Sequence, residues 1–156
     1  MKKWPLDDIS LDFPHIFLIH SSAGSGKTEN LANRYIQFIL SDKIPKNSVS
    51  NILAITFTEN SAKDMKNRII NVLKKIALGD EEALERIRKY LPLEKEILRK
   101  KAGIKIEEIL DNYSFFNIST IDSFVMKVFE ASSKKLDYPA EREVSFKYAD
   151  IMDGAF

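Results

Sequence analysis

The stretch from Ser21 to Thr28 has the residue types that bind phosphate. It reads Ser-Ser-Ala-Gly-Ser-Gly-Lys-Thr, follows the apolar run 16–19 and precedes a helical pattern. The N–H groups of such a loop point inward and bind anionic oxygens, while glycine lets the backbone approach them closely. We therefore predict that Lys27 reaches the β- and γ-phosphates of a nucleotide and that the Thr28 hydroxyl is a Mg²⁺ ligand.

The predicted nucleotide site departs from the strict P-loop pattern at Ser21, where that pattern has glycine. A chance glycine–serine turn ahead of a helix is the alternative, but the order of strand, loop and helix favours phosphate binding. The predicted cofactors are ATP and Mg²⁺, with Lys27 and Thr28 as catalytic residues. The predicted nucleotide contacts are Ser22, Ala23, Gly24, Ser25, Gly26, Lys27, Thr28 and Glu29.

Two further loops carry hydroxyl or aromatic groups that can bind DNA. Thr56, Phe57 and Thr58 follow an apolar run, and Thr120 follows another. Threonine hydroxyls bond DNA phosphates, and a phenylalanine ring can stack on a base. These four residues are the predicted DNA contacts. The alternatives stay open: strand alternation would bury Phe57 in the core, and Thr120 can cap the helix that follows it.

The elements that position these loops alternate between strands and helices. The predicted strands are 16–19, 51–57 and 115–119, and the predicted helices are 27–40, 61–78 and one that begins near 121. Gly79 is the expected stop of the second helix. Such an order implies an α/β fold with a parallel sheet flanked by helices, whose ligands bind at the carboxyl ends of the strands.

The charged segment 80–112 interrupts this alternation and is predicted to be a helical insertion. Leu84, Ile87 and Leu91 form only a thin apolar stripe in it, so solvated helices are expected. Pro92 and Gly103 are expected to divide the segment into short helical pieces.

The composition is that of a globular protein with one core. The chain has 156 residues, of which 44% are hydrophobic and 30% are charged. The net charge of +1 gives no electrostatic indication of nucleic acid, and the absence of cysteine excludes disulfides and thiol catalysis. Because the apolar runs are too short to cross a bilayer and no signal peptide is visible, we expect a cytoplasmic protein without a membrane partner.

Three motifs together resemble those of the UvrD/RecB-type superfamily 1 DNA helicases, in particular the RecB/AddA-like branch that includes the exonuclease V beta subunit. The nucleotide loop is similar to the first motif. Residues 52–69 look like the DNA-contacting motif, usually Thr-Phe-Thr-Asn-Lys-Ala-Ala-x-Glu-Met-x-x-Arg, and 118–124 resembles the later Thr-x-His-x-Phe motif. Glu59, Asn60 and Ser61 stand where the family usually has Asn, Lys and Ala, and Asp122 replaces the His.

The resemblance implies that residues 1–156 are the N-terminal part of a RecA-like ATP-binding domain. The implied function is ATP-dependent unwinding of DNA in recombination and repair, with single-stranded or unwinding duplex DNA, the remaining helicase domains and recombination-complex subunits as partners. The family's catalytic Asp-Glu pair follows a strand, whereas Asp80-Glu81 here follows a helical pattern. We therefore expect an incomplete domain that hydrolyses little or no ATP by itself. A small P-loop kinase, with 80–101 as its lid, and a nucleotide-binding regulatory module without hydrolysis are the alternatives.

Overall fold

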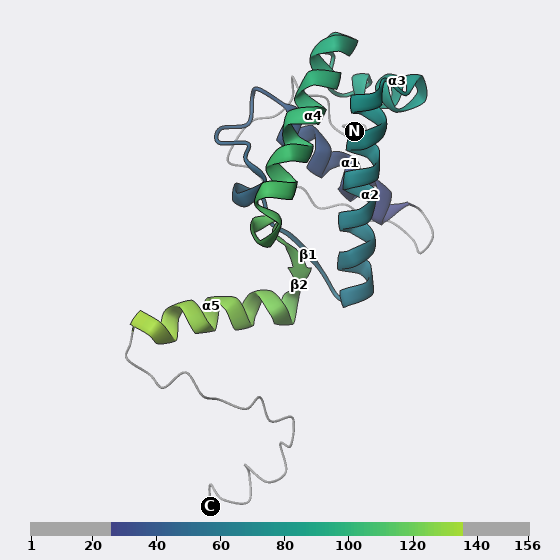
Figure 1. Cartoon of the computed structure of the whole chain (residues 1–156). Helices are drawn as coiled ribbons and strands as arrows, with labels where there is room; N and C mark the ends of the chain where they lie inside the picture. The colour runs from purple at the N-terminus through teal and green to yellow at the C-terminus, as the bar shows by residue number, and fades with distance from the viewer. Residues whose placement is uncertain (1–25, 136–156) are drawn as a thin grey trace, which may run out of the picture. The chain divides into compact units, whose positions relative to one another are not determined.

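The computed structural model describes residues 26–135, which fall into two units divided after Ile121 (Figure 1). The predicted strand 16–19 and loop residues Ser22, Ala23, Gly24 and Ser25 lie outside this range. The first unit contains, in chain order, α1 (Lys27–Leu40), η2 (Val49–Asn51), β1 (Ala54–Thr56), α2 (Glu59–Leu78), α3 (Glu81–Arg88), α4 (Lys95–Asp111), η3 (Tyr113–Phe115) and β2 (Ile118–Thr120). The second unit holds nearly all of α5 (Ile121–Lys135).

The two described strands pair in parallel, which confirms the predicted direction of the sheet. Ala54 lies opposite Ile118 and Thr56 opposite Thr120. Both strands are shorter than predicted, because the short helices η2 and η3 take up residues at their amino ends. The first of them is apolar but is not buried on both faces: alternation turns Ala54 inward, whereas Ile55 is 38% exposed.

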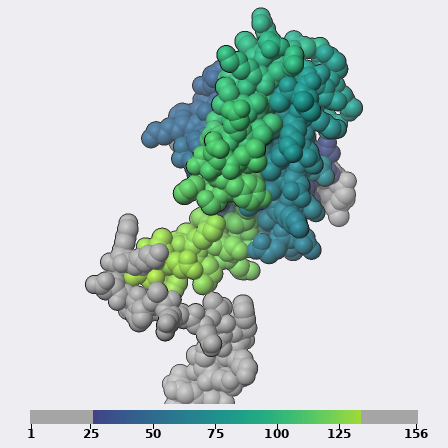
Figure 2. All heavy atoms as spheres, in the orientation of Figure 1, coloured from purple at the N-terminus to yellow at the C-terminus, as the bar shows by residue number. Residues whose placement is uncertain are grey.

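Helix α2 is the centre of the hydrophobic core. Its buried residues Met65, Ile69, Leu73 and Ile76 recur at helical spacing and form one apolar stripe. This stripe packs against α1, α4 and the strands. Figure 2 shows the side chains of α4 and α2 in continuous contact on the face in view. None of the helices within residues 26–135 is both long and apolar enough to cross a bilayer.

The ends of the first two helices follow local rules that the sequence carries. Helix α1 has the predicted bounds. Helix α2 begins two residues earlier than predicted, since the side chain of Thr58 caps it by accepting a hydrogen bond from the N–H of Ser61. Gly79 ends α2 with a φ of 83°, in the left-handed region that favours glycine.

The segment 80–112 differs from its prediction at Gly103, which does not divide it, since α4 runs through that position without a break. The predicted thin apolar stripe is confirmed: Leu84, Ile87 and Leu91 are buried in the core, as is Leu98 of α4, while most other residues of α3 and α4 are not buried. Burial of such side chains outweighs the cost of one helical glycine, which is about 1 kcal/mol. The segment packs on α2 rather than standing apart as a lid; its status as an insertion in a larger domain stays a prediction.

A carboxylate on α4 fixes the connection between α1 and β1. Glu108 accepts hydrogen bonds from the Ser48 hydroxyl at 2.5 Å, the Val49 N–H at 2.9 Å and the Lys105 ammonium at 2.8 Å. Lys105 also donates to the carbonyl of Asn47 at 2.9 Å. Burial alone would raise the pKa of Glu108, but these hydrogen bonds outweigh it and hold the pKa below its ordinary value of 4.5.

Replacing Glu108 should make stability less dependent on pH. Since its pKa is lowered in the folded state, the carboxylate stabilises the fold above pH 4.5, and this contribution is lost as the pH falls through the folded-state pKa. We expect Glu108→Gln to unfold at lower urea concentration than the wild type near neutral pH, with the difference shrinking in acid. Glu107→Gln, an exposed neighbour, is the control. A difference that is the same at every pH would contradict this assignment.

Alanine substitutions at Gly103, within α4, and at Gly79, at the end of α2, should change the free energy of unfolding in opposite directions. Gly103→Ala should raise the free energy of unfolding by about 0.5–1 kcal/mol, because a Cβ there meets no atom within 4 Å and helical alanine is favoured over glycine. Gly79→Ala should lower it, since its φ is positive and Arg99 Nε would lie 3.3 Å from the new Cβ. Urea unfolding of both variants measures the two shifts; shifts of equal sign would refute the explanation.

Candidate nucleotide and nucleic-acid site

The end of the phosphate loop has the backbone conformation that its sequence implies. Gly26 lies at φ 78° and ψ 25°, immediately before α1, and its carbonyl accepts the N–H of Asn30 at 2.9 Å. Side chains other than hydrogen are disfavoured at this φ, so the glycine has a conformational reason to be there. Lys27 and Thr28 are exposed in the first turn of α1. The described residues thus fit a phosphate at this helix start, while the contacts themselves stay predictions.

Glu29 faces the neighbouring helices. Its carboxylate accepts a hydrogen bond from Arg86 of α3 at 2.7 Å and lies 3.9 Å from Arg68 of α2. Arg86 also approaches Glu82 at 3.6 Å. The first turn of α1 is therefore tied to the segment 80–112, a contact between residues 57 positions apart that no local pattern could have indicated. A direct role of Glu29 toward nucleotide stays a prediction.

The second and third predicted loops meet at one edge of the sheet. Thr56 and Thr120 are partners in the parallel register and end β1 and β2. Ligands of such sheets bind at the carboxyl ends of the strands. The structure therefore brings together the groups that the sequence singled out for DNA, although their sequence positions lie far apart.

Phe57 projects from this edge into solvent. It is 87% exposed, so the alternative that strand alternation buries it is wrong. The Thr56 hydroxyl donates to the carbonyl of Thr58 at 3.1 Å, and the Thr58 hydroxyl donates to Ser61 Oγ at 2.8 Å. The chain has already left the strand at Phe57, because Thr58 is committed to capping α2. The alternation of inward and outward side chains along β1 therefore no longer applies at Phe57.

Thr120 differs from the other threonines in being buried. It is only 4% exposed, and its hydroxyl donates to Oε1 of Glu59 at 2.9 Å. Glu59 is the residue at this edge that sequence reasoning did not assign a role. The one sequence feature that could have indicated a role is that Glu59 stands where the UvrD/RecB-type pattern usually has Asn. The cap of α5 by Thr120 stays a prediction.

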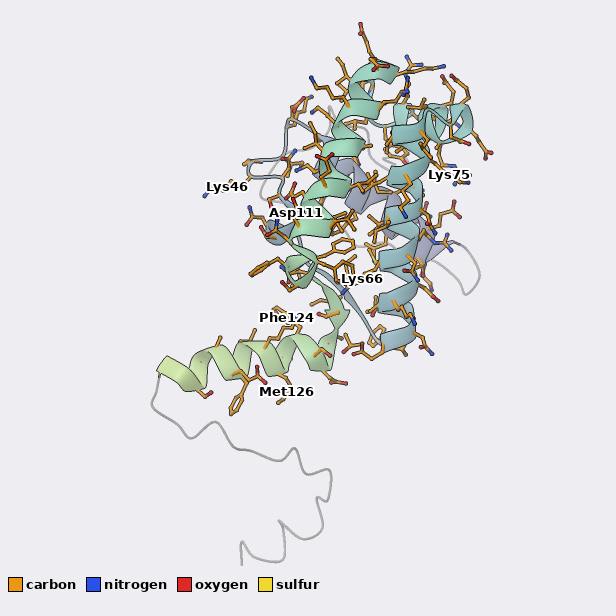
Figure 3. All side chains as sticks on the ribbon, viewed as in Figure 1. Lys46, Lys66, Lys75, Asp111, Phe124 and Met126 are labelled. Carbon is orange, nitrogen blue, oxygen red and sulfur yellow. The ribbon has the colours of Figure 1, made fainter. Side chains whose placement is uncertain are left out.

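The Lys66 ammonium of α2 lies against two aromatic rings. Lys66 points from α2 toward the chain that follows α4 (Figure 3). Its ammonium lies 5.3 Å from the ring centre of Tyr113 and 5.9 Å from that of Phe116. Within residues 26–135 no group of three or more histidine, aspartate or glutamate side chains is arranged to hold a metal ion. For Mg²⁺, Thr28 is the described candidate ligand, to be completed by nucleotide oxygens and water.

The chain matches the UvrD/REP helicase N-terminal domain over residues 8–153. It belongs to this family. The predicted resemblance to UvrD/RecB-type helicases is thereby confirmed, and the UvrD/REP family implies a RecA-like fold. The predicted α/β class holds in coarse form, since the described part is mostly helical around a small parallel sheet.

Curated relatives of this UvrD/REP domain are components of helicase/nuclease enzymes. The chain is 31% identical over 137 residues to an ATP-dependent helicase/nuclease subunit of Bacillus velezensis, a match that covers 88% of this chain and 9% of that protein. It is 36% identical over 120 residues to the protein of the same name from Bacillus cereus, covering 77% and 8%. The chain thus spans less than a tenth of these relatives. No solved structure matches it.

Proposed function

We propose that this chain is the ATP-binding and single-stranded-DNA-contacting segment of an ATP-dependent DNA helicase of recombination and repair. The observation that carries the proposal is the register of the sheet, which sets Thr56 beside Thr120 with Phe57 exposed next to them. Membership of the UvrD/REP family supports it and argues against the small kinase. Unwinding, hydrolysis and any nuclease partnership belong to the complete protein, whose proposed place of action is the cytoplasm.

At the nucleotide loop, this chain's residues would bind and orient ATP. Gly26 supplies the left-handed turn into α1, and the first N–H groups of that helix favour an anion. The Lys27 ammonium would neutralise the β- and γ-phosphates, and the Thr28 hydroxyl would help to hold Mg²⁺. The ion when bound draws charge from the phosphates, whereas the remaining helicase domains would supply the groups that complete hydrolysis.

At the sheet edge, the chain's residues would hold one DNA strand. Phe57 offers a ring face to a base without regard to sequence, as a translocating motor requires. Thr56 and Thr58 stand on either side of that ring in the sequence, and their hydroxyls, which donate to the Thr58 carbonyl and to Ser61 Oγ here, would turn to the phosphates when DNA binds. Helix α2 begins at this edge and reaches Glu29 of α1 through Arg68, so one rigid helix connects the proposed DNA and nucleotide sites.

Removal of the Phe57 ring should weaken DNA binding without unfolding the chain. Stacking of one base on an aromatic ring is worth about 1–3 kcal/mol, so Phe57→Ala should raise the Kd for a labelled oligothymidylate at least fivefold in a low-salt anisotropy titration. Phe115→Ala is the matched control: this ring is 58% exposed, but it precedes the amino end of β2. Equal affinities of both variants and the wild type would contradict the proposed DNA contact.

Nucleotide binding should depend on Lys27. A fluorescent ATP analogue with Mg²⁺ should bind the wild type and lose most of its affinity for Lys27→Ala, because the ammonium is the proposed partner of two phosphates. Lys43→Ala, which removes an exposed lysine from the loop after α1, should leave binding unchanged. Nucleotide binding without any DNA binding would favour the regulatory module instead.

A further inference from the structure

The carboxylate of Glu59 holds the hydroxyl through which Thr120 would contact DNA. The Thr120 hydroxyl donates to Glu59 Oε1 across 2.9 Å, and the two residues are 61 positions apart. We propose that Glu59 competes with the DNA backbone for Thr120 and thereby weakens single-stranded-DNA binding by this chain. This inference rests on the proposed function above. Glu59 is thus an affinity-determining residue of the DNA site.

The competition follows from the number of hydrogens available. A threonine hydroxyl has one hydrogen to donate, and a phosphate oxygen at neutral pH can only accept. The hydrogen of Thr120 is directed to Glu59, so a phosphate must replace the carboxylate to use it. Because Thr120 is 4% exposed, little of it remains open to a second partner.

Charge adds to this effect. Glu59 is the residue after the cap Thr58, so its side chain sits in the first turn of α2, where a helix favours a negative group. Glu59 follows the exposed Phe57 by two positions in the chain. A DNA phosphate there would meet a like charge at close range, whereas a stacked base would not, because bases are uncharged.

Glu59 can move aside without disturbing the core. Glu59 is exposed, whereas the first buried side chains of α2, Ala62 and Met65, lie about one and two turns further along the helix. DNA binding at Thr120 would therefore exchange one acceptor for another. The consequence is a site in which the Phe57 ring contributes more to affinity than the phosphate contact does.

The test is an anisotropy titration of labelled oligothymidylate with the whole chain at low salt. Glu59→Gln keeps the shape and removes the charge, and it should bind about fivefold more tightly than wild type, the effect of one like charge at about 4 Å in water. Glu59→Ala also removes the acceptor of the Thr120 hydroxyl and should bind at least as tightly. The gain should diminish as salt rises. Wild-type binding with no gain in either variant would overturn this inference and leave the proposed function standing.

A charge-matched control separates a local effect from a change in net charge. Glu96→Gln removes one carboxylate near the other end of α2, since Arg99 of the same turn lies against Gly79, the cap of that end. Helix α2 has 20 residues, about 30 Å, which exceeds the screening length at 0.1 M salt. Glu96→Gln should bind DNA like the wild type. An equal gain from it would refute the role of Glu59.

Thr120→Val tests whether Glu59 acts through the hydroxyl. Valine keeps the shape of the buried side chain, and circular dichroism checks that the variant is folded. Glu59→Gln keeps an oxygen that can accept from Thr120, whereas Glu59→Ala does not. Glu59→Ala should therefore bind DNA more tightly than Glu59→Gln, and this additional gain should disappear in the Thr120→Val background; an additional gain of unchanged size there would overturn the competition for Thr120. If neither the wild type nor any Glu59 variant bound DNA, the proposed function itself would fail, an outcome distinct from all of these.

Discussion

The packing of α2 against α1 and α4 is the interaction on which the rest of the structure depends. Four buried side chains of α2 form the stripe that meets both neighbours. Each such burial contributes about 1.5–3 kcal/mol before entropy is counted, more than any single polar contact at the surface. Because β1 leads directly into α2 and α4 leads back to β2, this apolar contact also decides where the threonines of the sheet edge lie.

Polar contacts fix the ends and connections of the elements that the apolar core packs together. Glu108 fixes the approach to β1, Thr58 fixes the start of α2, and Glu29 joins α1 to Arg86 of α3. The Thr58 contact caps the start of one helix, whereas the Glu108 and Glu29 contacts join segments that are far apart in the sequence. The candidate site therefore depends on contacts spread through the first unit and not on the loops alone.

Local rules explain why much of this could be predicted from the sequence. The bounds of α1, the Gly79 stop and the stripe of α2 follow from residues adjacent in the chain. Predictions failed where a distant partner decided the outcome: α4 continues through Gly103 because Leu98, Ala102 and Ile109 of the same helix are buried in the core. Phe57 is exposed because a helix cap follows it. The contact of Thr120 with Glu59 depends on the register of β1 and β2, which no single segment contains.

The antiparallel course of α2 and α4 sets a limit on the lengths that evolution can alter. The start of α4 lies beside the end of α2, where Arg99 meets Gly79, and the rings after α4 lie beside Lys66 near the start of α2. Helices α2 and α4 thus span nearly the same distance between the sheet and their far ends. One added turn in either helix would shift β2 by about 5.4 Å along β1 and part Thr56 from Thr120. Insertions are compatible with the paired strands only between the helices, where added residues leave both lengths as they are.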